Sequence, residues 1–150
     1  DIRIPQALEI AEERGIVVSF GQAILREAHP NTAQLILHGR SGQRLEIIGQ
    51  SLGGSRINIA QLDGIETNFS GESPTLVVYN EDRPGHVSEV TTMLSNQNIN
   101  IASMRLYRSS RGGEAVMVVE CDQEVPESGI DWLRGFDGIR KVTYLGMTGE

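Results

Sequence analysis

Apolar and polar residues follow two different periods in the first seventy residues of the chain. Apolar side chains fall at helical spacing over the first eleven residues, with Pro5 in the first turn and Gly15 just after the end. This pattern predicts a helix near residues 4–14. The β-branched and aromatic run 16–20 predicts a short strand that follows the helix closely.

Between Ala33 and Ser70 the period changes to two, which is typical of strands with one covered face. Turn signals rich in glycine and aspartate interrupt this stretch at residues 39–42, 53–54 and 63–64. We therefore expect an antiparallel meander of about four short strands.

The small, polar stretch 70–74 predicts a boundary between one domain over residues 1–72 and a second over residues 73–150. The elements predicted after it are a strand at 75–79, a helix that ends near 96–98, strands at 99–107 and 115–121, a helix at 126–136 and a strand at 140–145. The order β-α-β-β-α-β is that of the ferredoxin-like fold, in which two helices cover one face of a sheet. The predicted fold class is α+β.

Composition narrows the class of protein. The 150 residues carry a formal charge of −7, and 39% of them are hydrophobic, which is enough for a real core and gives no basic surface for phosphate groups. Neither nucleic acid nor a membrane is therefore an expected partner. No apolar run approaches the roughly 18 to 20 residues that cross a bilayer. A single cysteine cannot form an internal disulfide, so we predict a cytoplasmic protein.

The most reactive residue types stand alone in the sequence. Cys121 ends an apolar strand and is interpreted as a small buried side chain, since one cysteine cannot hold zinc or an iron–sulfur cluster. Lys141, the single lysine, has no phosphate-binding loop beside it for a pyridoxal cofactor. His29, His38 and His86 lie too far apart in the sequence to predict a metal site. We expect no catalytic residue, metal or cofactor in this chain itself.

The polar turn 80–85 carries the most promising chemistry. A turn from strand to helix places backbone N–H groups and the positive end of the helix next to side-chain acids and amides. We expect Asn80, Asp82, Pro84 and Gly85 to bind a small zwitterion such as an amino acid. Its carboxylate would meet the helix N-terminus, and its ammonium group would bond Asp82 and the amide oxygen of Asn80. The alternative is that Asp82 and Asn80 only cap the turn and the helix.

A second part of this binding site is expected at Asn98, Asn100 and Ile101, where the second strand of the predicted unit begins. These residues are available to a ligand held by the same chain or by a neighbouring one. The alternative is that the two asparagines satisfy a loop.

A second candidate polar site lies just before the meander, at His29, Asn31 and Thr32. Pro30 forces His29 into an extended conformation, so the histidine and asparagine side chains can point the same way off a rigid turn. The alternative is an ordinary turn held by backbone hydrogen bonds.

Residues from about 74 to 146 resemble an ACT domain, a small amino-acid-sensing module. The resemblance is carried by the stretches Asn-Glu-Asp-Arg-Pro-Gly-His at 80–86 and Asn-Ile-Asn-Ile at 98–101. Serine-sensing ACT domains of dehydrogenases usually have His where Asn80 stands and Asn where Asp82 stands. ACT units usually complete their ligand cleft across a two-fold axis, so the resemblance implies a homodimer formed through this domain.

Residues 1–72 resemble the latter part of the allosteric-substrate-binding domain of iron–sulfur-dependent L-serine dehydratases and of some D-3-phosphoglycerate dehydrogenases. The stretches 29–32 and 51–57 carry this resemblance, and 3–15 together with 113–120 look closer to the dehydratase β subunit. The implied fold is a partial allosteric-substrate-binding α/β domain followed by a ferredoxin-like βαββαβ ACT domain.

The resemblance implies a regulatory or assembly chain of an enzyme that converts L-serine to pyruvate and ammonia. L-serine or a related amino acid would be the effector, and an α subunit would be the partner whose cysteines hold a [4Fe–4S] cluster. This chain alone would not be catalytic. The family's Ser-Ser-Ser-His-Thr motif, expected near the start of the β subunit, is absent. If Asp1 is a boundary within a longer protein, we expect this piece to lack part of its effector site.

Two alternatives remain open at this point. One is the C-terminal effector-binding region of a D-3-phosphoglycerate dehydrogenase, and the other is a free-standing amino-acid-sensing ACT module that acts on another partner.

Overall fold

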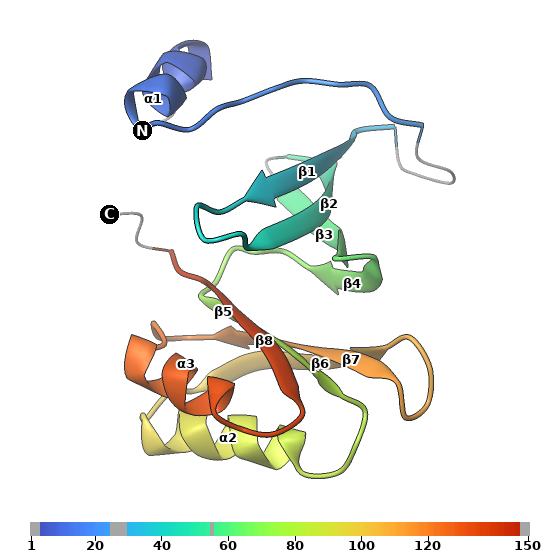
Figure 1. The fold of residues 1–150 in the computed structure, drawn as a ribbon, viewed down its shortest axis with the longest axis vertical. Helices are drawn as coiled ribbons and strands as arrows, with labels where there is room; N and C mark the ends of the chain where they lie inside the picture. Colours follow the sequence, from blue (N-terminus) through green and yellow to red (C-terminus); the bar gives the residue numbers. More distant parts are fainter. Residues whose placement is uncertain (1–3, 25–29, 55, 148–150) are drawn as a thin grey trace.

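The computed structural model describes residues 4–24, 30–54 and 56–147, and it contains two four-stranded antiparallel sheets (Figure 1). A short 3-10 turn, Ile4–Gln6, and the helix α1, Ala7–Glu13, precede the first sheet. This helix confirms the one predicted near residues 4–14. In the described part of the chain, no helix is long and apolar enough to cross a membrane.

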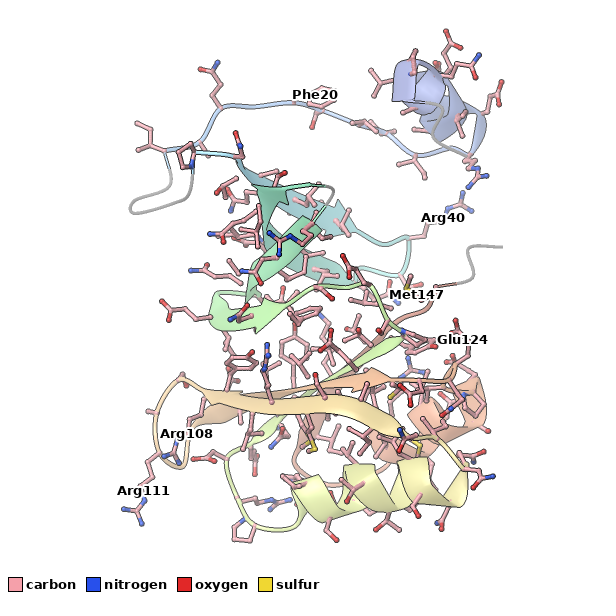
Figure 2. All side chains as sticks on the ribbon, turned by 180° about the vertical axis from the view of Figure 1, so that it is seen from behind. Phe20, Arg40, Arg108, Arg111, Glu124 and Met147 are labelled. Atoms are coloured by element: carbon pink, nitrogen blue, oxygen red, sulfur yellow. The ribbon has the colours of Figure 1, made fainter. Side chains whose placement is uncertain are left out.

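The strand predicted over residues 16–20 is wrong. The chain is irregular from Ile16 to Ile24, and its apolar side chains point into solvent, with Val17 96% and Phe20 83% exposed. A strand needs a neighbour for its backbone hydrogen bonds. β1 is an edge of the first sheet and pairs only with β2, so residues 16–20, the irregular segment that carries Phe20 in Figure 2, pair with no strand of the described chain.

The first sheet is the predicted meander. Its four strands pair in chain order as β1 (Thr32–His38), β2 (Arg44–Gly53), β3 (Arg56–Leu62) and β4 (Ile65–Phe69). The β3–β4 turn, Asp63-Gly64, has a positive φ at both residues, and the Asp63 carboxylate accepts a hydrogen bond from the Glu46 backbone N–H at 2.8 Å. Alternation with turn chemistry was therefore sufficient to predict this sheet.

The second half has the predicted order β-α-β-β-α-β. Its elements are β5 (Thr75–Glu81), α2 (His86–Asn96), β6 (Ile101–Arg108), β7 (Glu114–Cys121), α3 (Glu127–Arg134) and β8 (Ile139–Leu145). The strands lie in the order β6-β7-β5-β8, so β6 and β8 are the sheet edges. Both helices cover the same face, which is the ferredoxin-like arrangement (Figure 1).

Two boundaries in this half differ from the prediction. β5 continues through Asn80 and Glu81, which pair with Ala115 and Glu114 of β7. Asn80 is therefore the last residue but one of this strand and does not lie in a loop. β6 begins at Ile101 and not at Ile99. Asn98 is left-handed with φ 60°, and the Ile99 N–H still bonds the helix carbonyl of Leu94 at 3.0 Å.

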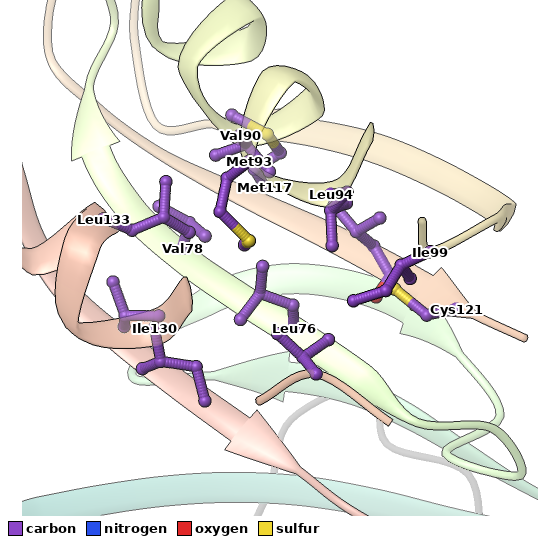
Figure 3. Close-up of a cluster of buried hydrophobic side chains, with 13 residues drawn as sticks. Leu76, Val78, Val90, Met93, Leu94, Ile99, Met117, Cys121, Ile130 and Leu133 are labelled. Atoms are coloured by element: carbon purple, nitrogen blue, oxygen red, sulfur yellow. The ribbon is translucent and has the colours of Figure 1, made fainter. Parts of the chain in front are cut away.

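The main core lies between the second sheet and its two helices, as Figure 3 shows. Leu76 and Val78 of β5 point into it, and Leu94 of α2 and Leu133 of α3 close it from the helix side, each fully buried. Because β-strand side chains alternate between faces, this core uses every second residue of β5.

A second core lies between the two sheets. It consists of the buried side chains Leu62, Phe69, Val77, Val116 and Val118. An ion pair supports it, because Lys141 of β8 binds the Asp63 carboxylate at 2.8 Å. The meander therefore covers the sheet face opposite the helices, and the central strands β5 and β7 are covered on both sides.

Candidate functional site

The turn between β5 and α2 holds the residues that we expected to bind an amino acid. Gly85 is the N-cap of α2 with φ 111°, a conformation that favours glycine, and no side chain among the described residues caps this helix. Pro84 is exposed just before it. The helix thus presents its positive end without a side-chain acceptor, which suits an incoming carboxylate.

Asn80 is the most informative residue of the turn. Its side chain is only 4% exposed, and its Nδ2 donates to the Glu81 carbonyl at 2.7 Å. Its Oδ1 is buried and has no hydrogen-bond partner among the described residues. An unpaired buried acceptor costs about 1 to 3 kcal/mol, so this oxygen is a natural acceptor for a ligand N–H group.

Asp82 is bound to the β6–β7 hairpin and does not cap the helix. Its Oδ2 accepts from the Gly112 backbone N–H at 2.9 Å and from Arg108 Nη1 at 3.3 Å. The Gly112 N–H, followed by Arg108, holds the pKa of Asp82 below its ordinary value, so the carboxylate stays charged. A ligand ammonium would therefore share Asp82 with these two donors.

Asn98, Asn100 and Ile101 lie at the other end of the sheet. Asn98 is exposed at the end of α2, and the Asn100 Nδ2 donates to the Asp122 carboxylate at 2.6 Å. Ile101 pairs with Cys121.

The strand register gives the distance between the turn 80–85 and the group formed by Asn98, Asn100 and Ile101. On β7, Asn80 pairs with Ala115 and Ile101 pairs with Cys121. Those β7 positions are separated by six steps of a strand, or roughly 20 Å at about 3.3 Å per residue. One chain therefore does not bring Asn80 and Asn100 to the same ligand.

The second candidate site is only partly within the described residues, because His29 lies outside them. The Asn31 carbonyl accepts from the Ser51 N–H at 2.9 Å, and Thr32 begins β1 opposite Gln50. Both residues belong to the meander, and the turn 80–85 belongs to the other sheet.

Cys121 is fully buried, as expected. Burial, together with the charge of Asp122, raises the pKa of its thiol to about 11, so the thiol is protonated at neutral pH. Among the described residues no three His, Cys, Asp or Glu side chains are grouped so that they could hold a metal ion.

A cleft of about 610 Å³ lies where the β1–β2 hairpin approaches β8, and its basic lining residues are Arg44, Arg134, Arg140 and Lys141. Each of these side chains is already paired with a carboxylate: Arg44 with Glu46, Arg134 with Glu127 and Asp131, Arg140 with Glu81, and Lys141 with Asp63. The cleft therefore has no excess positive charge that would select an anion.

Sequence reasoning missed one group of residues beside the turn. Arg83 reaches across to Asp137 on the α3–β8 turn, with its Nη2 2.9 Å from the carboxylate, and its Nε lies 3.1 Å from the Nε2 of the buried His86. Asp137 lies 54 residues from Arg83, and no local signal in the sequence predicts that contact.

Comparison with known proteins agrees with this fold. Residues 75–134 match the model of the ACT domain family. The probable L-serine dehydratase β chain of Bacillus subtilis is 35% identical over 145 residues, which are 97% of this chain and 66% of that protein. The L-serine dehydratase β chain of Peptoniphilus asaccharolyticus is 28% identical over 97% of this chain and 66% of its own length.

The likeness extends to a second kind of enzyme. The D-3-phosphoglycerate dehydrogenase of Methanocaldococcus jannaschii is 31% identical over 97% of this chain but only 27% of its own length. This chain thus spans just under two thirds of the two dehydratase β chains and about a quarter of the dehydrogenase. Residues 75–134 are thus an ACT domain, and the chain is similar over nearly its whole length to the L-serine dehydratase β chains.

Proposed function

We propose that this chain is a regulatory part of an L-serine dehydratase, an ammonia-lyase, and that it binds L-serine or a related amino acid through its ACT domain. The observation that carries the proposal is the Asn80 Oδ1, a buried acceptor with no partner among the described residues, next to the uncapped start of α2. Together they offer an acceptor for an ammonium group and a positive helix end for a carboxylate.

The complete site is shared between two copies of the chain. β5 and β6 are both antiparallel to β7, so they run parallel, and Asn80 and Asn100 lie at opposite ends of the sheet. β6 is a sheet edge, and no strand of the described chain lies on its outer side. Antiparallel pairing of two β6 edges about a two-fold axis would bring Asn80 of one copy and Asn100 of the other to the same end of the joined sheet.

The catalytic chemistry belongs to another chain in this proposal. A [4Fe–4S] cluster is held by cysteine thiolates, and this chain has one cysteine, which is buried and protonated at neutral pH. Its residues do not fit such a cluster. We therefore place the cluster ligands on an α subunit, and we expect this chain alone to be inactive.

Calorimetric titration with L-serine tests the effector site. Asn80→Ala should weaken binding by about tenfold, because it removes the buried acceptor. Asn68→Ala is the matched control, since Asn68 is an exposed residue of β4 and lies on the other sheet. Equal affinity of both variants and the wild type would remove the turn 80–85 as the site.

A second candidate function is the effector-binding region of a D-3-phosphoglycerate dehydrogenase. The match to the Methanocaldococcus jannaschii enzyme over nearly the whole chain favours it. The two candidates differ in the neighbouring catalytic part: a dinucleotide-binding domain in the same reading frame supports the dehydrogenase, and a separate cysteine-bearing subunit supports the dehydratase. Dehydratase turnover by the isolated chain would contradict the primary proposal.

A further inference from the structure

His86 is a buried titratable group in the first turn of α2, only 2% exposed. Its Nε2 lies 3.1 Å from Arg83 Nε, and its Nδ1 lies 2.7 Å from a carboxylate oxygen of Glu89. Because a guanidinium can only donate, Nε2 must accept, and the ring proton must be on Nδ1, from which it donates to Glu89. The surroundings thus specify a neutral imidazole with one defined tautomer.

Arg83 also contacts two other segments of the chain. Its Nη2 binds the Asp137 carboxylate at 2.9 Å, and its Nη1 lies 3.7 Å from Glu81 at the end of β5. Gly138 leaves room for the guanidinium and the imidazole. A Cβ on Gly138 would lie 2.5 Å from Arg83 Nη2 and 2.7 Å from His86 Nε2. The contacts of Arg83 and His86 form a network that connects the end of β5, the start of α2 and the α3–β8 turn.

We propose that His86 is a positioning residue that helps to hold the turn 82–85 through Arg83, and that protonation of His86 removes one of the contacts that hold this turn. A doubly protonated imidazole has no acceptor, so the bond from Arg83 is lost, and the contact with Glu89 is kept. The consequence for ligand affinity rests on the proposed function: L-serine should bind more weakly as the pH falls.

Charged groups from three segments face His86. Glu89 of α2 and Asp137 of the α3–β8 turn are acidic, and Arg83 of the turn 82–85 is basic. Glu81 and Arg140 act indirectly, because Glu81 pairs with Arg83 and with Arg140. The hydrogen bond from Arg83 lowers the pKa of Asp137, so this carboxylate stays charged at neutral and mildly acidic pH.

Nuclear magnetic resonance of the ligand-free chain tests the positioning role directly. Ring nitrogen shifts at about pH 8 should show the Nδ1–H tautomer, and the amide signals of Gly85 and Gly138 should move together as the pH falls to about 5.5. His86→Gln should abolish this movement, because Gln can accept from Arg83 and donate to Glu89 without titrating. His38→Gln, which removes a histidine on β1, should leave it unchanged.

L-serine titration of the same three proteins tests the functional consequence. Between about pH 8 and about pH 5.5, affinity should fall about fivefold in the wild type and in His38→Gln, which corresponds to the loss of one hydrogen bond. It should change less than about twofold in His86→Gln. An Nε2–H tautomer, or the same pH response in His86→Gln, would overturn the inference. If L-serine binds at no pH and the amide signals still titrate through His86, the proposed function fails and the positioning role stands.

Discussion

The two halves of the molecule place their apolar side chains differently. The second half encloses a core between its sheet and its own helices, and side chains such as Leu94 and Leu133 are fully buried there. In the described part of the first half, no hydrophobic residue that precedes Leu62, the last residue of β3, is fully buried. Val17 and Ile24 are almost completely exposed, and Leu37 is half-exposed.

This difference indicates which half contributes more to the stability of the folded chain. The βαββαβ half has burial on both faces of its sheet, and the buried hydrophobic residues of the meander are Leu62 and Phe69, which pack against that sheet. Because burial of apolar surface is the dominant favourable contribution to folding, stability should be concentrated in the second half. The first half should depend on contact with it.

The largest expected effect is a cavity in the second half. Leu94→Ala should lower the free energy of unfolding by about 3 to 5 kcal/mol, because a fully buried leucine leaves a void. Leu37→Ala makes the same chemical change on β1, where the side chain is 49% exposed, and should cost less than about 1 kcal/mol. Urea unfolding of both variants measures the contrast, and equal losses would contradict it.

The next effect concerns the attachment of the meander. Phe69→Ala removes a buried ring from the core between the sheets and should weaken this attachment by about 3 kcal/mol. Hydrogen exchange should then speed up at the amides of β2 and β3 but not at those of β7. Phe20→Ala, at an 83% exposed position, is the control and should change neither. Faster exchange at β7 to the same extent would mean that the halves unfold as one unit.

A smaller effect should follow from filling the space at Gly138. Gly138→Ala combines a positive φ of 87° with a clash against Arg83 and His86, and it should cost about 2 to 3 kcal/mol. Gly112→Ala shares the positive φ but has no atom within 4 Å of the added Cβ, so it should cost about 1 kcal/mol. Thermal unfolding of the two variants isolates the clash. The same loss in both would show that the network does not restrain Gly138.

The smallest expected effect is that of the ion pair between the sheets. Burial alone would raise the pKa of Asp63, but the hydrogen bonds from Lys141 and from the Glu46 N–H hold it below its ordinary value. A depressed carboxyl pKa contributes stability above the unfolded-state value of about 4, and this stability is lost as the pH falls through the folded-state pKa.

Lys141→Met should therefore remove only about 0.5 kcal/mol at neutral pH, since both side chains are partly exposed and solvent screens the pair. Acid unfolding followed in parallel should show a smaller loss of stability below about pH 4 in Lys141→Met than in the wild type. An equal acid response would mean that Asp63 is not stabilised by this lysine.

The sequence was sufficient to predict the order of elements, because hydrophobic periods and turn residues are local signals. It failed at residues 16–20, where a β-branched run was not enough to form a strand without a neighbouring one. The contact of Asp82 with Gly112 and the burial of the Asn80 Oδ1 depend on residues far away in the chain. Only the folded register shows that Asn80 and Asn100 lie at opposite ends of one sheet.

The most direct test of the shared effector site is a mixing experiment with Asn80→Ala and Asn100→Ala. If each site uses Asn80 of one copy and Asn100 of the other, each variant alone should lose tight L-serine binding. A mixed dimer should contain one intact site and one site with both changes. Random mixing should therefore restore about a quarter of the wild-type sites in a calorimetric titration. No restored binding in mixtures shown to exchange subunits would contradict the shared site.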